Sequence, residues 1–252
     1  MFFQECPALM MAGGRSERMR ACGSRKHKAL RTVLGVVLIE RNIQTLLLFG
    51  FRQLFIAVNA AESELIEWIK EKAPVLTKSM PARIHLLLEA QPLGTIGAAT
   101  LLPEDTENVL VVNVDNLTSL DLNALANFHL ECGATFTVAT HEEPFRIPFG
   151  RLETSGQLVT QYCEKPEILV PISSGTYVLH RRAIERISPA IRTDVPQLVN
   201  GLIQEEEHVA CFRHHAHWID INDEASLARA EALLKANEKA WPQPSRSVGA
   251  SV

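Results

Sequence analysis

The chain has 252 residues, long enough for one domain with a large buried core. Its 46% hydrophobic and 21% charged residues are ordinary for a globular protein. A net charge of −4 and a pI near 6.1 argue against a general nucleic-acid or membrane-surface binder.

Cysteine usage and the absence of a long apolar run predict a location in the cytoplasm. The five cysteines are scattered and form no C-x-x-C pair, which favours reduced thiols over a disulfide framework or a zinc site. The first residues, MFFQEC, are acidic at Glu5 and do not read as a signal peptide. No apolar stretch approaches the roughly 18 residues that a membrane-spanning helix needs.

The hydrophobic pattern predicts alternating strands and helices over the first 140 residues. The expected elements are a strand over 8–11, a helix over 36–49 ended by Gly50, a strand over 54–58, a helix over 61–73 closed by Pro74, strands over 83–88 and 109–114, a helix opening at 97–99, a helix over 121–132 and a strand over 134–140. Strands that are apolar on both faces predict an α/β fold, with a parallel or mixed sheet covered by helices on both sides.

The pattern changes after residue 140. Strand-like pieces over 150–153, 158–163 and 176–179 are joined by turns, and helices are expected from 181, over 195–204 and over 223–237. No repeat or linker interrupts the chain, so residues 1–240 are expected to form one domain. The polar, turn-rich residues 241–252 are expected to be a disordered tail.

The loop after the first expected strand is the most distinctive stretch. Residues 9–30 read LMMAGGRSERMRACGSRKHKAL, in which Gly13-Gly14 leave backbone N–H groups accessible and a segment rich in Lys and Arg follows. Such a loop suits a phosphate, although a basic surface loop has the same composition. Neither G-x-x-x-x-G-K-[ST] nor G-x-G-x-x-G is present, which excludes two common phosphate-binding loops.

Several motifs, in order along the chain, resemble those of the sugar-1-phosphate nucleotidylyltransferase family. The loop resembles G-G-x-G-[ST]-R-[LM] followed by P-K-P-L, with Ser16 and Glu17 as departures. The later matches are QPLGTIGA at 91–98, NVD at 113–115 for N-G-D, FGRLE at 149–153 for Y-G-V-V-E, QYCEKP at 161–166 for F-V-E-K-P, SGTY at 174–177 for [NS]-A-G-I-Y, and HWIDI at 217–221 for W-x-D-[IV]-G.

The resemblance implies a Rossmann-like nucleotidyltransferase (GT-A-like) fold, with a mixed, mostly parallel sheet and the site over the strand ends. The catalytic residues would be Arg18, Lys28 and Lys165, which would hold the pyrophosphate, the nucleotide phosphates and the sugar phosphate. The Mg²⁺ ligands would be Asp115 and Asp220. The nucleotide-binding residues would be Leu9, Ala12, Gly13, Gly14, Arg15, Gln91, Gly94 and Thr95. The sugar-binding residues would be Asn113, Gly150, Glu164, Gly175 and Thr176.

The reaction implied by the resemblance joins a nucleoside monophosphate from an NTP to a sugar 1-phosphate, or to a sugar-like cyclitol phosphate, and releases pyrophosphate. The QPLGTIGA segment is most similar to mannose- or heptose-1-phosphate guanylyltransferases, which favours GTP. The segment ERMR at 17–20 resembles short uridylyltransferases, so UTP or dTTP stay open. The implied partners are the two substrates. A homodimer is left open, and neither nucleic acid nor a membrane is expected.

Three alternatives accompany this interpretation. A glycosyltransferase of similar architecture usually carries Asp-x-Asp, which the segment 113–115 is not. A non-catalytic nucleotide-sugar-binding homologue would account for the departures Ser16, Glu17 and Val114. The histidines at 214, 215 and 217 suggest a metal site, but without a fixed companion ligand an exposed histidine-rich strand is the preferred interpretation.

Overall fold

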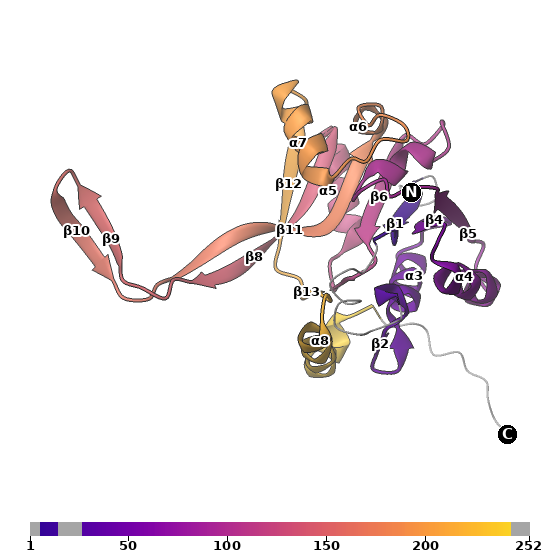
Figure 1. Ribbon diagram of the computed structural model, residues 1–252, viewed down its shortest axis with the longest axis horizontal. Coiled ribbons are helices and arrows are strands. Elements are labelled where there is room, and N and C mark those ends of the chain that lie inside the picture. Colours follow the sequence, from indigo (N-terminus) through magenta and orange to yellow (C-terminus); the bar gives the residue numbers. More distant parts are fainter. Residues whose placement is uncertain (1–5, 15–26, 243–252) are drawn as a thin grey trace.

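The computed structural model of the chain describes residues 6–14 and 27–242. Within them lies a seven-stranded sheet in the order β12 (Val209–His214), β8 (Phe136–Arg146), β11 (Glu167–His180), β6 (Asn108–Asn113), β1 (Ala8–Met11), β4 (Gln53–Asn59) and β5 (Arg83–Glu89) (Figure 1). β11 is antiparallel to both of its neighbours, and the other pairs are parallel. The predicted mixed, mostly parallel sheet is therefore confirmed.

Helices cover both faces of this sheet, as predicted. One face packs against α3 (Leu38–Leu48), α4 (Ser63–Leu76) and α5 (Leu122–Glu131), and the other against the 3₁₀ segment η2 (Gly97–Leu101), α6 (Arg181–Ile184) and α7 (Val195–Gln204). The alternation of side chains along β1 explains why both faces are covered. Ala8 and Met10 point to the face that packs against α3, α4 and α5, whereas Leu9 and Met11 point to the opposite face. Alternate side chains of one strand thus serve opposite layers.

A third, smaller core lies beside the sheet. Its buried residues come from β2 (Thr32–Val33), which pairs with β3 (Val36–Val37), from the start of α3, from β7 (Asn116–Thr118), from the residue after β13 (Trp218–Asp220), from α8 (Glu224–Ala236) and from Trp241 after η3 (Glu238–Ala240). The 3₁₀ segment η1 (Lys28–Leu30) packs into the first core instead. Trp241, which was assigned to the tail, is buried in this core, with its ring centroid 6.2 Å from that of His217. The tail residues 243–252 lie outside the described residues.

Three predicted boundaries are wrong. Pro74 lies inside α4, which continues to Leu76, because losing one N–H donor in the last turn does not end a helix. The helix expected to open at Gly97 is a five-residue 3₁₀ segment. Residues 36–37 pair as a strand, so α3 begins at Leu38, and it stops before Gly50, whose φ is 95°.

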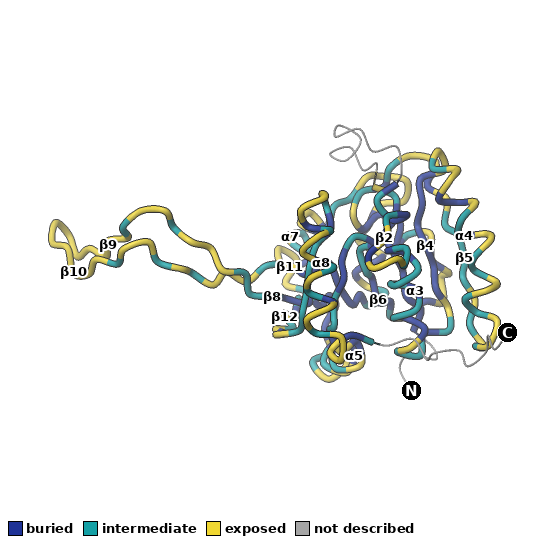
Figure 2. The backbone as a smooth tube through the Cα atoms, turned by 90° about the horizontal axis from the view of Figure 1, so that it is seen from below, coloured by how far each residue is buried: buried dark blue, intermediate teal, exposed yellow. Residues whose placement is uncertain are grey.

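β8 and β11 are longer than predicted and leave the body together as an arm, defined here as residues 142–173. The two strands stay paired out to Arg146 and Glu167, and β9 (Arg151–Ser155) and β10 (Leu158–Cys163) form a hairpin at its tip (Figure 1). No residue of the arm is buried (Figure 2). Prolines at 144, 148, 166 and 171 interrupt the β-pattern, so the sequence indicated only short strand pieces.

The described cysteines are free thiols, namely Cys6, Cys132, Cys163 and Cys211. In the same described part of the chain, every helix is too short or too polar to span a lipid bilayer.

Candidate active site

The candidate site lies where the parallel neighbours β1 and β6 end, near the centre of the sheet. β1 leads into Gly13-Gly14 and β6 leads into Asp115. Lys28 donates a hydrogen bond to Asp115 Oδ2 and forms an ion pair with it, and the two side chains are 18% and 14% exposed. A Cβ on Gly14 would lie 3.8 Å from Lys28 Nζ. The glycine loop, the lysine and the aspartate therefore lie together.

Asp220 reaches the same place from a neighbouring strand. β13 pairs with β7 so that Asp220 is opposite Asn116, and the N–H of Ile221 donates to the carbonyl oxygen of Asp115 at 2.9 Å. Two predicted metal ligands thus lie at one end of the sheet. Asp220 Oδ2 also accepts a hydrogen bond from the amide of Asn222.

This donor set fits Mg²⁺ that is shared with a substrate. Mg²⁺ commonly takes one or two protein carboxylates and fills its other positions with water and phosphate oxygens. No group of three or more His, Cys, Asp or Glu side chains in the described ranges could hold a metal by itself. Asp115 and Asp220 therefore match an open magnesium site rather than a closed protein cage.

Three predicted sugar-binding residues lie beside the carboxylates. Gly175 has a φ of 69°, and a Cβ there would strike the amide nitrogens of Asn116 and Asn113. Asn116 Nδ2 donates to the carbonyl oxygen of Ser174 at 2.8 Å, which fixes the chain around the glycine. Thr176 is buried within the sheet. Asn113 and Gly175 therefore lie against each other next to Asp115, whereas the side chain of Thr176 is enclosed in the sheet.

The predicted nucleotide-binding segment at 91–95 is fastened to the loop before α7. A Cβ on Gly94, whose φ is 86°, would strike the carbonyl oxygen of Thr193. The N–H of Thr95 donates to Asp194 Oδ1 at 2.9 Å, and Gln91 Nε2 donates to a backbone carbonyl of that loop at 2.6 Å. Gln91, Gly94 and Thr95 therefore each hold this segment against the loop before α7, in addition to the nucleotide-binding role that was predicted for them.

The remaining predicted residues of the first strand and loop divide into two groups. Leu9 and Ala12 are fully buried, and the N–H of Ala12 donates to the carbonyl oxygen of Ala57 at 2.9 Å. Their side chains support the loop from the core. Arg15 and Arg18 lie outside the described residues.

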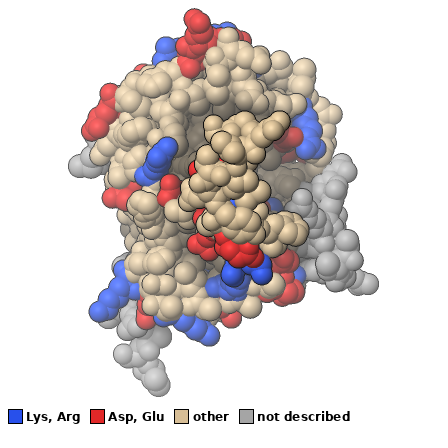
Figure 3. Space-filling view, turned by 90° about the vertical axis from the view of Figure 1, so that its left-hand side faces the viewer, with Lys and Arg blue, Asp and Glu red and all other residues tan. Residues whose placement is uncertain are grey.

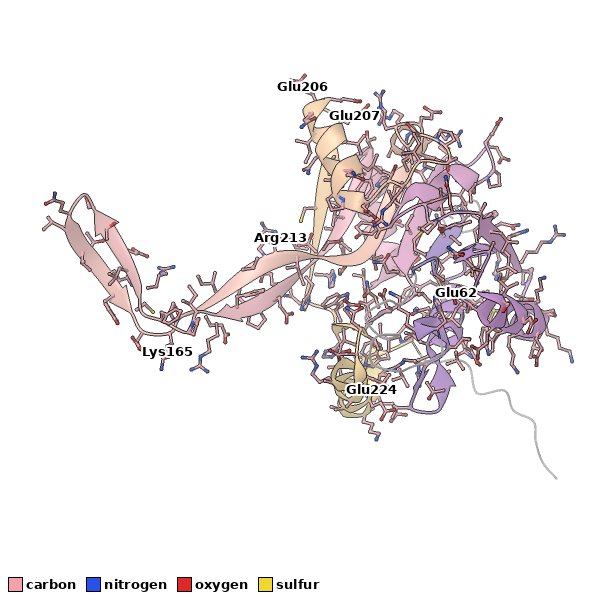
Figure 4. The ribbon with its side chains drawn as sticks, in the orientation of Figure 1. Glu62, Lys165, Glu206, Glu207, Arg213 and Glu224 are labelled. Atoms are coloured by element: carbon pink, nitrogen blue, oxygen red, sulfur yellow. The ribbon has the colours of Figure 1, made fainter. Side chains whose placement is uncertain are left out.

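Gly150, Glu164 and Lys165 are not brought to the site within this chain. All three lie on the arm, beyond the paired parts of β8 and β11, and Lys165 points from the arm far from the sheet (Figure 4). A Cβ on Gly150 would strike the ring and hydroxyl of Tyr162, so this glycine is needed for packing within the arm. Lys165 has a φ of 46°, and its Nζ is 4.0 Å from Glu164 Oε1.

Sequence reasoning also missed Glu89, which lies directly beneath the glycine loop. It ends β5, is 2% exposed, and occupies the place that a Cβ on Gly13 would need. Its Oε2 accepts a hydrogen bond from the N–H of Leu93 at 3.1 Å, and its buried Oε1 has no hydrogen-bond partner among the described residues. Burial raises the pKa of Glu89, against the lowering effect of the Leu93 N–H. The sequence did contain a signal for Glu89, because it is an acidic residue at the end of a parallel strand. The same rule had identified Asp115 as a candidate site residue.

Glu89→Gln is expected to stabilise the protein at neutral and alkaline pH. Because the folded-state pKa is raised, the folded protein binds this proton more tightly, and wild-type stability falls as pH rises from the ordinary glutamate value through the folded pKa. Tm measured from pH 4 to pH 9 should be higher in the variant at the alkaline end and similar at pH 4. The exposed Glu104→Gln controls for lost charge, and a pH-independent difference would contradict the explanation.

The histidine-rich strand is not exposed throughout, contrary to the prediction. His214 is buried, and its Nε2 lies 3.3 Å from Ser174 Oγ. Burial, followed by the nearby His141 and His215, lowers the pKa of His214 to about 4. His214 is therefore neutral at pH 7 and packs beside Ser174.

The fold and this site place the chain among α/β proteins that carry a glycine-rich loop and carboxylate side chains at the carboxyl ends of parallel strands. The chain matches the nucleotidyl transferase family over residues 7–237, and it belongs to that family.

Curated relatives and solved structures agree with this membership. The chain is 26% identical to mannose-1-phosphate guanyltransferase beta-A of Xenopus laevis and 27% identical to mannose-1-phosphate guanyltransferase of Schizosaccharomyces pombe, each over 85% of this chain. It spans 60% of the length of these two relatives. HddC from Yersinia pseudotuberculosis superposes with a TM-score of 0.70 at 19% identity, covering 91% of this chain and 99% of HddC. HddC has also been solved in complex with GMP-PN.

Proposed function

We propose that the chain transfers a nucleoside monophosphate, GMP, from GTP to a sugar 1-phosphate and releases pyrophosphate. The observation that carries this proposal is that Gly13-Gly14 and the Lys28–Asp115 pair lie together at the ends of the adjacent strands β1 and β6, with Asp220 brought beside Asp115 by β13. The arrangement provides backbone donors, a cation and two carboxylates around one position, which is what a phosphoryl-transfer site needs.

The chemistry needs positioning and charge neutralisation rather than covalent catalysis by the protein. An oxygen of the sugar phosphate attacks the α-phosphorus, the bond between that phosphorus and the bridging oxygen breaks, and pyrophosphate leaves with the electron pair. Lys28 would hold the nucleotide phosphates, Arg18 the pyrophosphate and Lys165 the attacking phosphate. Gly13-Gly14 would place N–H groups against phosphate oxygens.

Asp115 and Asp220 would hold Mg²⁺, which, when bound, offsets charge on the phosphate oxygens. Lys28 already places its ammonium group on Asp115 Oδ2. We therefore assign Lys28 a second role, which is to neutralise Asp115 until the metal and nucleotide arrive.

GTP is favoured as the nucleotide because the relatives at 26% and 27% identity are named guanyltransferases of mannose 1-phosphate. The acceptor is then mannose 1-phosphate or a heptose 1-phosphate, bound near Asn113, Gly175 and Thr176. The free thiols of the described cysteines support a cytoplasmic enzyme, in which residues 1–240 act as one nucleotidyltransferase domain.

The test is pyrophosphate release in the presence of Mg²⁺, with GTP, UTP, dTTP, CTP and ATP crossed against a panel of sugar 1-phosphates. Release with GTP and a mannose-type or heptose-type acceptor is expected. Release with UTP or dTTP alone would contradict the choice of base. Nucleotide binding without release would favour the non-catalytic homologue, and neither binding nor release would overturn the proposal.

A further inference from the structure

The arm exposes an unusual amount of apolar surface. Of the sixteen exposed large hydrophobic side chains in the described ranges, eight lie on the arm, namely Phe145, Phe149, Leu152, Leu158, Val159, Tyr162, Leu169 and Val170. Figure 2 shows the arm as exposed and intermediate segments with no buried residue. Figure 3, which views the arm end-on, shows mostly uncharged atoms with charged groups gathered at one side.

A two-stranded ribbon is at best marginally stable by itself in water. The exposed apolar side chains lie on both of its faces, because Phe145 pairs with Ile168 whereas Leu169 pairs with Pro144. Exposed apolar surface of this kind marks an interaction site. The arm has about 30 residues, which is the number that each partner contributes to a stable protein–protein interface.

The described part of the body, residues 6–14, 27–141 and 174–242, does not cover the arm. β8 and β11 remain hydrogen-bonded partners from Thr140 and Ser173 to Arg146 and Glu167, and they carry the arm straight away from the sheet (Figure 1). At about 3.4 Å per residue, Glu167 lies roughly 20 Å along β11 from Ser173, and Lys165 lies beyond it. Folding the arm back would require the paired strands to bend sharply, whereas docking on another molecule requires no change in this chain.

The arm begins at the candidate site and carries a group that the proposed reaction needs. Ser174 and Gly175, at its root, contact Asn116 beside the two aspartates. Among the described residues that meet there, Lys28 supplies the cation, and it is already paired with Asp115. In the proposed reaction Lys28 holds the phosphates of the nucleoside triphosphate and Arg18 the pyrophosphate, so the attacking sugar phosphate needs a further positive charge. The same arm carries that charge outward as Lys165.

We propose that the arm docks on a second copy of this chain and places Lys165 in the partner's active site. The placement of Lys165 rests on the proposed function, whereas docking rests on the exposed apolar surface. In a twofold dimer two antiparallel arms lie side by side, so that Lys165, at the base of each tip hairpin, reaches the root of the other arm and both sites are completed in trans.

The first test measures mass. Light scattering during gel filtration should give twice 28.0 kDa for the full chain. In a shortened variant, residues 147–166 are replaced by Asn-Gly, which joins the facing residues Arg146 and Glu167 through a two-residue hairpin turn. This variant should be a monomer with a circular dichroism spectrum similar to that of wild type. A full chain that is monomeric at tens of micromolar would overturn the proposal.

The second test asks whether Lys165 acts in trans. Lys165→Ala and Asp115→Asn are co-expressed with different tags, and the heterodimer is purified on both. It should show about half the wild-type turnover although each variant alone is inactive, because one of its two sites has both groups. The matched control pairs wild type with the double variant Lys165→Ala/Asp115→Asn, and this heterodimer should be inactive.

Action in cis would reverse the two heterodimer results and overturn the placement of Lys165. Full activity of Lys165→Ala alone would also overturn it. If wild type releases no pyrophosphate with any substrate pair, the proposed function fails. The masses of the full chain and of the shortened variant then still decide whether the arm docks on a second copy.

Discussion

Asp115→Asn is expected to lower the rate of pyrophosphate release by about 10³-fold while the protein remains folded. The carboxylate lies at the end of β6, next to the glycine loop, and it pairs with Lys28. An amide keeps the shape but supplies no negative charge for Mg²⁺ or for the ammonium group. The rate loss is measured as kcat at saturating Mg²⁺ with the substrate pair found active.

The stability of Asp115→Asn should change much less than its rate. Lys28 loses its ion-pair partner but is 18% exposed and can reach water, so the cost is about 1 kcal/mol, or about 2–4 °C in Tm. Asp121→Asn is the matched control. Asp121 caps α5 by accepting the N–H groups of Asn123 and Ala124, and asparagine caps equally well. A variant at 115 that merely unfolds, or that retains full activity, would contradict the assigned role.

The layered fold could be predicted from the sequence because it depends on which strands are buried, and buried strands are recognisable by their apolar residues. Each parallel strand is apolar on both faces, as at 54–58, and a strand covered on both sides has few alternatives. The positions of Gly13 and Asp115 followed for a related reason, because each comes just after a parallel strand and the ends of neighbouring strands meet at one edge of a sheet. Asp220 was indicated by the motif resemblance alone, and it lies in β13, which pairs with β7 outside the seven-stranded sheet.

The direction in which the arm leaves the body could not be predicted from the sequence. The segments around Gly150 and Lys165 were identified as strand pieces and motif residues, and that description of their local structure is confirmed. Their position depends on the long pairing of β8 with β11, which is set over many residues by hydrogen bonds and shifts register between Ser173 and Tyr177, and not by any one motif. Glu89 was missed because its burial beneath Gly13 depends on β5 lying beyond β4 in the sheet.

Gly175→Ala is expected to destabilise the protein by about 2–4 kcal/mol and to lower kcat/KM by about 10–100-fold. A φ of 69° costs a residue with a Cβ about 1 kcal/mol or more. The new methyl group would also collide with the amides of Asn116 and Asn113. Moving Asn116 breaks its hydrogen bond to the carbonyl oxygen of Ser174 and shifts the chain next to Asp115.

Gly133→Ala separates the cost of a positive φ from the cost of the collision with the two asparagines. Gly133 has a similar φ of 60°, but nothing lies within 4 Å of the place where its Cβ would be. It should therefore lose only the backbone cost of about 1 kcal/mol and keep full activity. Chemical denaturation gives the two free energies of unfolding, and initial rates give the two values of kcat/KM. If both alanine variants lose equal stability and neither loses activity, the contact between Gly175 and the two asparagines does not shape the site.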